Sequence, residues 1–226
     1  MSAPRVAVHF FYDVISPYSW LAFESLTRHA QVWPSVDLKL RPFFLGKIMA
    51  ESKNKPPLLV KAKGMYMLHD LKRLGAFHGV PLAIPPAFKE YVFRVEEQRQ
   101  QMLFVTAVDV VTDGRETEPV SRELFKAIFK EHTEVGKLPL AQLAQRAGLS
   151  AQVADHCLSE SKSKRVEERL DKSCDEALAF GAFGAPTTVA LLPSGPQLFF
   201  GCDRVELLAH TLQLKYHGAL LCKSRL

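Results

Sequence analysis

Ser16 begins the segment with the clearest capacity for chemistry. The motif Ser16-Pro17-Tyr18-Ser19 follows a strand-like run, and serine before proline is typical of a helix start. A helix N-terminus offers free backbone N–H groups and the positive end of the helix dipole, and both stabilise an anion. Cysteine thiols at such places have pKa values of ~3.5–7.5 instead of about 8.5, so a ligand's thiol held there would ionise more readily. Ser16 could donate a hydrogen bond to that sulfur, or it could serve only as the helix cap.

The elements around this motif follow from hydrophobic patterns and from helix-start signals. Residues 5–12 are β-branched and aromatic, as in a buried strand, and a helix is expected from residue 17 to about residue 31. Residues 36–42 alternate as a second strand should. The lysine-rich residues 45–63 are expected to form a loop.

Helical patterns dominate residues 64–180, and strand patterns return only at 187–192 and 197–200. Ser194-Gly195 between these two strands is typical of a hairpin turn. Asp203-Arg204-Val205-Glu206 fits a capping box that opens a last helix to about Tyr216.

This order of elements is typical of an α/β, thioredoxin-like fold (βαβ–ββα) with a large all-helical insertion. The first part of the thioredoxin-like domain is expected at residues 1–62 and its second part at residues 182–226. Residues 63–181 between them are expected to form a helical insertion domain.

Pro186 lies in a second segment of interest, Gly184-Ala185-Pro186-Thr187, just before the third strand. In a thioredoxin-like fold the loop at this place holds a cis-proline that faces the active helix. A cis bond would leave the backbone of Ala185 free to pair with an extended peptide. The alternative is an ordinary trans proline at a strand entry.

Two further segments could bind charged parts of a ligand. Cys202 and Asp203 precede the last helix, where an α-amino-α-carboxylate group could be received, unless Asp203 acts only as a cap. Asn54 lies in the lysine-rich loop, and amide and lysine side chains are suitable partners for carboxylates. The alternative for this loop is a purely solvated segment.

The composition of the 226 residues, 47% hydrophobic and 23% charged, is typical of a soluble globular protein. The net charge of +5 permits anionic ligands, but no basic motif indicates nucleic acid. The four cysteines form no C-x-x-C pair and no zinc-type spacing, so free thiols and no metal site are expected. No apolar run reaches the ~18 residues that a membrane-spanning helix needs.

Taken together, these segments resemble the kappa-class glutathione S-transferases, a family similar in fold to bacterial disulfide oxidoreductases. The resemblance covers nearly the whole chain, in the same order. Its residues are Phe11-Tyr12-Asp13-Val14, Ser16-Pro17-Tyr18-Ser19-Trp20, Asn54-Lys55-Pro56-Pro57, Tyr66, Gly181-Ala182-Phe183-Gly184, Pro186, Gly201-Cys202-Asp203-Arg204 and Glu206-Leu207-Leu208.

The resemblance implies a glutathione transferase that binds glutathione as a thiolate and conjugates it to small electrophiles such as aryl halides. Hydroperoxide reduction is a further implied activity. Glutathione would be a co-substrate, and no metal would be needed. The resemblance also implies a homodimer, located in peroxisomes or mitochondria. The charge pattern and the hydropathy described above predict no nucleic-acid partner and no membrane insertion.

The resemblance also implies a role for each matching residue. Ser16 would contact the glutathione sulfur, and Pro17 and Tyr18 would line the site. Asn54 would hold a terminal part of glutathione, and Cys202 and Asp203 would bind its γ-glutamyl end. Ala185, which precedes the cis-proline Pro186, would pair with the cysteinyl backbone. Two of these positions depart from the family pattern. Ala185 is often a larger apolar residue, and Cys202 is often serine, which donates a hydrogen bond more strongly.

Two other functions fit the same residues. One is a glutathione-dependent isomerase of the 2-hydroxychromene-2-carboxylate type, and the other is a redox-inactive thioredoxin-like chaperone or interaction module. Disulfide exchange at this site is excluded by chemistry, because Ser16 and Ser19 stand where the oxidoreductases have both cysteines of C-x-x-C.

The C-terminal tripeptide and the acceptor pocket complete the expectations. Ser224-Arg225-Leu226 matches the peroxisomal S-K-L address with one basic residue exchanged for another, which predicts a peroxisome, with the mitochondrion as the alternative. The pocket for the electrophile is expected between the core and the helical block. Its candidate lining residues are Tyr18, Met65, Tyr66 and Phe104.

Overall fold

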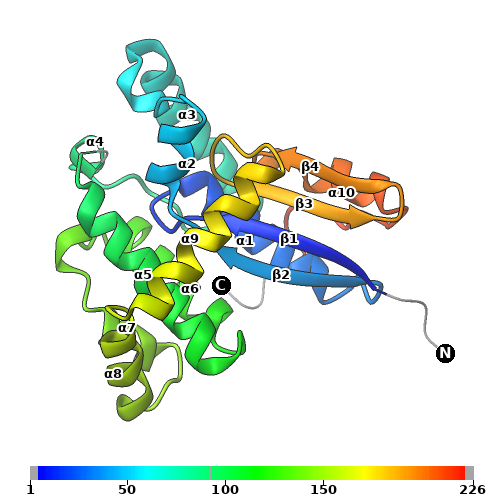
Figure 1. Ribbon diagram of the computed structural model, residues 1–226. Coiled ribbons are helices and arrows are strands. Elements are labelled where there is room, and N and C mark those ends of the chain that lie inside the picture. The colour runs from blue at the N-terminus through cyan, green and yellow to red at the C-terminus, as the bar shows by residue number, and fades with distance from the viewer. Residues whose placement is uncertain (1–4, 92, 222–226) are drawn as a thin grey trace.

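The computed structural model describes residues 5–91 and 93–221, and its core is a four-stranded sheet. The strands lie in the order β2-β1-β3-β4 (Figure 1). They comprise β1 (Val6–Tyr12), β2 (Val36–Pro42), β3 (Thr187–Leu192) and β4 (Gly195–Phe200). β1 pairs with β2 in parallel and with β3 in antiparallel orientation, and β3 and β4 form an antiparallel hairpin.

β1 is central in the sheet, which explains its continuous apolar sequence. A strand covered on both faces needs apolar residues at successive positions instead of an alternating pattern. Phe10, Phe11 and Tyr12 are accordingly all fully buried. β1 therefore ends inside the protein, and the loop that follows it is held by the core.

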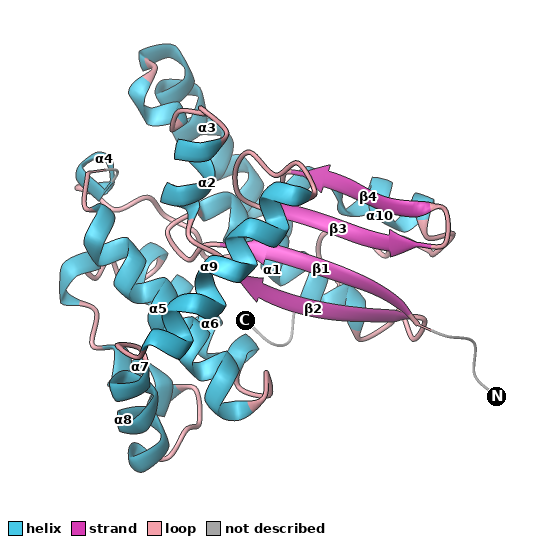
Figure 2. Ribbon diagram, viewed as in Figure 1, coloured by secondary structure: helices cyan, strands magenta, loops and turns pink. Residues whose placement is uncertain are grey.

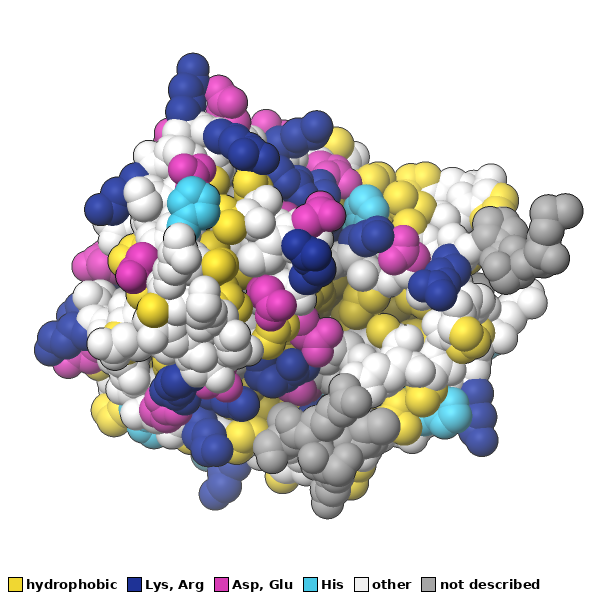
Figure 3. All heavy atoms as spheres, turned by 90° about the horizontal axis from the view of Figure 1, so that it is seen from below, with side chains coloured by type: hydrophobic (Ala, Val, Ile, Leu, Met, Phe, Trp, Pro, Cys, Tyr) yellow, Lys and Arg dark blue, Asp and Glu magenta, His cyan; other side chains and the backbone are white. Residues whose placement is uncertain are grey.

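Helices cover both faces of the sheet, and on the surface shown in Figure 3 basic and acidic side chains are intermixed. In Figure 1, α9 (Lys164–Ala179) crosses in front of the strands, whereas α1 (Pro17–Ala30) and α10 (Val205–Thr211) lie behind them. An aromatic cluster joins α1 to the helical block, because the Trp20 ring stacks on Phe125 and Phe129 with ring centroids 6.1 and 6.0 Å apart. Tyr12 is hydrogen-bonded to Ser121 in the same core, at 2.6 Å.

The helical block lies between β2 and β3 in the sequence. In Figure 2 it lies beside the C-terminal ends of β1 and β2. Its α-helices are α2 (Leu45–Glu51), α3 (Lys61–His78), α4 (Phe88–Tyr91), α5 (Val95–Thr112), α6 (Thr117–Phe129), α7 (Leu140–Arg146), α8 (Ala151–Glu160) and the α9 already described. Short 3₁₀ turns are η1 (Pro57–Leu59) and η2 (Val135–Lys137), and η3 (Cys202–Arg204) precedes α10. The predicted α/β fold, a thioredoxin-like core with a large helical insertion, is confirmed.

Residues 45–63 are not the loop that their lysines suggested. They contain α2, η1 and the first turn of α3. α2 begins where the buried carboxylate of Asp13 accepts a hydrogen bond from the Leu45 amide, at 2.9 Å. This helix start is therefore stabilised by a residue distant in sequence, which local patterns do not reveal.

The expectations for the C-terminal elements need two corrections. Asp203 forms no capping box, because it lies in η3 and forms an ion pair with Arg204. α10 begins without a side-chain cap and ends at Thr211 instead of Tyr216. The hairpin turn lies at residues 193–194, and Gly195, with φ of 113°, is already the first residue of β4.

Candidate functional site

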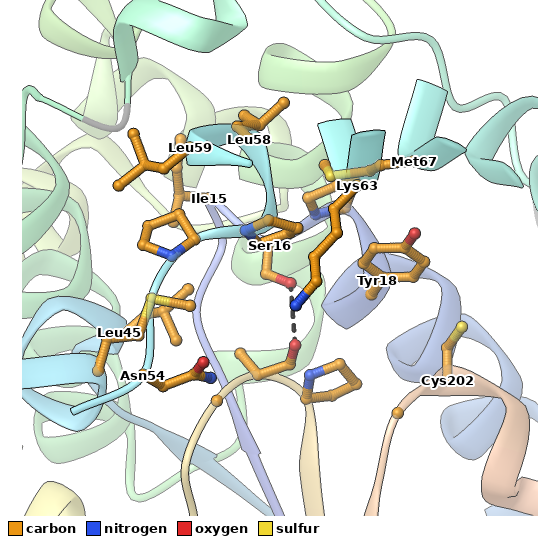
Figure 4. A pocket seen from close by; sticks show the side chains of 18 of the residues that line it. Ile15, Ser16, Tyr18, Leu45, Asn54, Leu58, Leu59, Lys63, Met67 and Cys202 are labelled. Carbon is orange, nitrogen blue, oxygen red and sulfur yellow. Dashed lines mark hydrogen bonds between the residues drawn. The ribbon is translucent and has the colours of Figure 1, made fainter. Parts of the chain in front are cut away.

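A cleft of about 1150 Å³ opens where the loop after β1, the loop before β3 and the helical block meet (Figure 4). The structure brings all the sequence-predicted site residues together along its wall. They are Ser16, Pro17, Tyr18, Asn54, Ala185, Pro186, Cys202 and Asp203. Segments from residues 16 to 203 thus contribute to one site.

Ser16 is the N-cap of α1, and its hydroxyl has two contacts. The oxygen accepts a hydrogen bond from the Ser19 amide at 3.1 Å, and the hydroxyl donates to the Ala185 carbonyl oxygen at a long 3.5 Å (Figure 4). The side chain is almost completely buried but lines the cleft. Capping and donation therefore use different parts of the same hydroxyl.

Asp13 holds the backbone around Ser16 in place. Its fully buried carboxylate accepts hydrogen bonds from the Ile15 amide at 3.0 Å and the Leu45 amide at 2.9 Å. Its carbonyl oxygen accepts from the Ser16 amide at 3.1 Å. Burial raises the pKa of the Asp13 carboxyl to about 7, although both amide hydrogen bonds oppose that rise.

The loop before β3 forms the opposite wall. The Ala185-Pro186 peptide bond is cis, and the Pro186 carbonyl oxygen accepts from the Gly201 amide at 3.1 Å. The Asn54 side-chain amide donates to the Phe183 carbonyl oxygen at 2.7 Å. Asn54 therefore joins the segment after α2 to this loop, and it is exposed enough to contact a ligand with its second N–H.

Cys202 is buried at the far end of the cleft. Burial raises the pKa of its thiol to about 12, and the neighbouring Asp203 carboxylate adds to the rise. The thiol therefore stays protonated at neutral pH. Asp203 itself is exposed and forms an ion pair with Arg204 at 2.6 Å.

Two charged residues of α3 were not anticipated as site residues. The Lys63 side chain extends from α3 toward Ser16 in Figure 4, and Lys63 lines the cleft. Asp70 accepts hydrogen bonds from the Tyr18 hydroxyl at 3.1 Å and from the Tyr66 hydroxyl at 3.4 Å. Burial and this carboxylate raise the pKa of Tyr18, which therefore stays neutral.

The structure separates the four candidates for the acceptor pocket. Tyr18 and Tyr66 line the cleft, whereas Phe104 is fully buried in the core and Met65 is 55% exposed and absent from the lining. The neighbouring Met67 lines the cleft instead. The helical pattern around residue 104 did not indicate whether Phe104 faces a cleft or the core.

The described residues contain no cluster of metal-binding side chains and no helix that could span a membrane. Among residues 5–91 and 93–221, no group of three or more His, Cys, Asp or Glu side chains could hold a metal ion. Over the same residues, no helix combines the length and apolarity needed to span a bilayer.

The sheet order, the cis-proline loop and the serine-capped helix define a thioredoxin-like protein in which serines replace a C-x-x-C pair. Residues 7–213 match the DsbA-like thioredoxin domain family. The chain is 37% identical to human glutathione S-transferase kappa 1, over 96% of this chain and 95% of that protein. It is 25% identical to 2-hydroxychromene-2-carboxylate isomerase of Pseudomonas putida, over 89% and 91% of the two chains.

A solved structure of 2-hydroxychromene-2-carboxylate isomerase has the same fold, with a TM-score of 0.71 and 22% identity over 92% of this chain and 94% of that chain. The chain belongs to the DsbA-like thioredoxin family and, within it, to the kappa-class glutathione S-transferases.

Proposed function

We propose that this protein binds glutathione as a thiolate in the cleft and transfers its sulfur to small electrophiles. The observation that carries the proposal is the position of Ser16, whose hydroxyl lies at the N-terminus of α1 and faces the Ala185 backbone across the cleft. A sulfur atom bound beside the Ser16 hydroxyl, in place of the Ala185 carbonyl oxygen as its acceptor, would meet the positive end of the helix dipole and one hydroxyl donor.

The charges of the cleft suit the two ends of glutathione. In Figure 4, Asn54 lies on one side of Ser16 and Cys202 on the other. The glycyl carboxylate would lie toward Asn54 and Lys63, since an amide and an ammonium group are donors for a carboxylate. The γ-glutamyl end would lie at Cys202 and Asp203. Asp70, whose negative charge contributes to the raised pKa of Cys202, would favour the α-ammonium group there.

The implied reactions follow from the bound thiolate. With an aryl halide, the sulfur bonds to the ring carbon and the halide leaves with the bonding electron pair. With a hydroperoxide, the sulfur takes the terminal oxygen, the alkoxide takes a proton, and a second glutathione converts the sulfenic acid into glutathione disulfide and water. The protein contributes a lowered thiol pKa and orientation of the reactants.

Ultraviolet absorbance of the thiolate tests the proposal directly. Adding glutathione at neutral pH should produce a thiolate signal, and S-methylglutathione, which has no thiol, should produce none. Conjugation of a chloronitrobenzene should follow the thiolate signal. Absence of both would reject the transferase and favour the chaperone or interaction module.

A second candidate function is the glutathione-dependent isomerase, favoured by the Pseudomonas putida relative. The isomerase uses the same thiolate but needs a carboxylate-bearing substrate. Turnover of 2-hydroxychromene-2-carboxylate in preference to a chloronitrobenzene would select it over the transferase.

We further propose a homodimer, supported by the sequence resemblance, and a peroxisomal location, supported by the C-terminal tripeptide. Light scattering at working concentration tests the dimer. Ser224-Arg225-Leu226 lies outside the described residues. Deleting residues 224–226 should abolish peroxisomal import, whereas unchanged import would contradict that address and a mitochondrial location would support the alternative.

A further inference from the structure

The cleft extends well beyond the residues assigned to glutathione. α3 lines it with one stripe of residues from Ala62 to Leu74. At 1.5 Å per residue these twelve steps span about 18 Å. The volume of about 1150 Å³ exceeds the ~300–1,000 Å³ typical of pockets for one drug-sized ligand, so an acceptor has room beside glutathione.

The part of the cleft lined by α3, α4 and the start of α5, which we name the α3–α5 arm, is apolar. It is lined by Met67, Leu74, Phe88, Tyr91, Phe93, Val95 and Gln98, from α3, α4, the turn that follows α4 and the start of α5. None of these seven residues carries a charge. The Gln98 amide donates to the Tyr91 carbonyl oxygen, and burial raises the pKa of the Tyr91 hydroxyl, which therefore stays neutral.

We propose that the acceptor is an elongated, uncharged aliphatic electrophile whose chain lies in the α3–α5 arm. The proposal rests on the transferase function and names its substrate class. An anionic chain would lose hydration in the arm and meet the Asp70 carboxylate, which lies between Met67 and Leu74 on the same face of α3. A cationic chain would compete for Asp70 with the α-ammonium group of glutathione. Each buried methylene group, in contrast, strengthens binding by about fourfold. The part of the α3 stripe that belongs to the arm, from Met67 to Leu74, spans about 10 Å at 1.5 Å per residue, which suits an extended chain better than a compact ring.

Long α,β-unsaturated aldehydes represent this class, and their reaction needs no oxidant. The thiolate sulfur bonds to the β-carbon, and the carbon–carbon π pair moves to the α-carbon to form an enolate. The enolate takes a proton from water, and the hydroxide released neutralises the proton that the glutathione thiol lost. No leaving group is expelled, so the thioether aldehyde is the sole product.

A homologous series from (E)-2-pentenal to (E)-2-decenal tests the proposal. The reacting atoms are the same throughout, so the uncatalysed rate with glutathione hardly depends on chain length. For the wild type, kcat/KM should rise by about two- to fourfold per methylene until the arm is filled.

Leu74→Trp places a larger side chain in the arm, where Leu74 is half-buried. It should lower the ratio of kcat/KM for decenal to that for pentenal at least tenfold. Leu68→Trp is the matched control, since Leu68 lies on α3 outside the lining and is 43% exposed. That control should leave the ratio unchanged. Leu74→Phe is a smaller change that carries the test if the tryptophan variant does not fold.

The thiolate signal of each protein distinguishes failure of the proposed substrate class from failure of the transferase function. A thiolate signal with a flat chain-length series would overturn the substrate class and leave the transferase function standing. Absence of a thiolate signal in the wild type would reject both the transferase function and the substrate class. A long-to-short ratio that falls equally in Leu68→Trp and the Leu74 variants would show that the α3–α5 arm does not hold the chain.

Discussion

The side-chain oxygen of Ser16 accepts a hydrogen bond from the Ser19 amide at 3.1 Å, so the cap of α1 keeps its own proton for another partner. That partner in this structure is the Ala185 carbonyl oxygen, at 3.5 Å. A sulfur anion is a stronger acceptor than a carbonyl at that length. The cap and the ligand contact, which sequence patterns present as alternatives, are therefore compatible.

Replacing Ser16 by alanine should raise the thiol pKa of bound glutathione. A hydrogen bond to a charged group contributes ~1.5–3 kcal/mol, which corresponds to a rise of about one to two pH units. The measurement is the pH titration of the thiolate absorbance. Loss of the cap should also lower the free energy of unfolding by ~1 kcal/mol.

Ser150→Ala is the matched control for Ser16→Ala. Ser150 caps α8 through a hydrogen bond from the Val153 amide at 3.3 Å and does not line the cleft. Loss of this cap should lower the free energy of unfolding about as much as Ser16→Ala does, and it should leave the thiol pKa of bound glutathione unchanged. Identical titrations for wild type and Ser16→Ala would show that the N-terminus of α1 stabilises the thiolate without the hydroxyl.

Replacing Lys63 by methionine should raise the KM for glutathione about three- to tenfold at low salt, because the glycyl carboxylate loses a cationic partner. The effect should diminish as salt screens the exposed charge. Lys61→Met is the control, since Lys61 lies on the same helix turn but outside the cleft lining. Steady-state kinetics at two ionic strengths would measure the KM for glutathione in both variants. Equal changes in the two variants would show that Lys63 does not contact glutathione.

Cys202 should be unreactive toward thiol reagents in the folded protein. It is 3% exposed, and burial raises its thiol pKa to about 12, whereas reactivity requires the thiolate. Native wild type and Cys202→Ser should therefore show the same number of fast-reacting thiols, with one more in the wild type after unfolding. Serine is the better donor, so glutathione affinity should be equal or higher in the variant. A faster native reaction in the wild type would contradict the buried position.

The stability contribution of Asp13 should depend on pH. Its pKa is raised from 3.8 in the unfolded chain to about 7 in the folded protein, so the folded protein binds more protons between these values. Its contribution is fully present below pH 3.8 and decreases as pH rises through about 7. The slope is at most about 1.4 kcal/mol per pH unit.

Urea unfolding of wild type and Asp13→Asn at several pH values would measure this slope. Other titrating groups are common to both proteins and cancel in the difference. The stability difference, wild type minus Asp13→Asn, should decrease from pH 4 to pH 7. Two parallel curves over that range would show that Asp13 does not titrate as the structure indicates.

The strength of the local signal explains which elements were predicted. The start of α1 was predicted because it depends on Ser16-Pro17, so neighbouring residues suffice to fix it. α2 depends instead on a hydrogen bond from Leu45 to the distant Asp13. The capping box was expected at Asp203 because its sequence fits, but the side chain pairs with Arg204.

By itself, the sequence determined the order of the four strands, the serine motif and the segments that meet in the cleft, because these depend on local patterns and on a resemblance that extends along the chain. Only the tertiary structure decided which face of α3 turns inward. That choice places Lys63, Asp70 and Leu74 in the cleft and leaves Met65 outside. The apolar and charged residues of α3 are spread around the helix, so packing against the rest of the protein, not helical periodicity, selects the residues that contact a ligand.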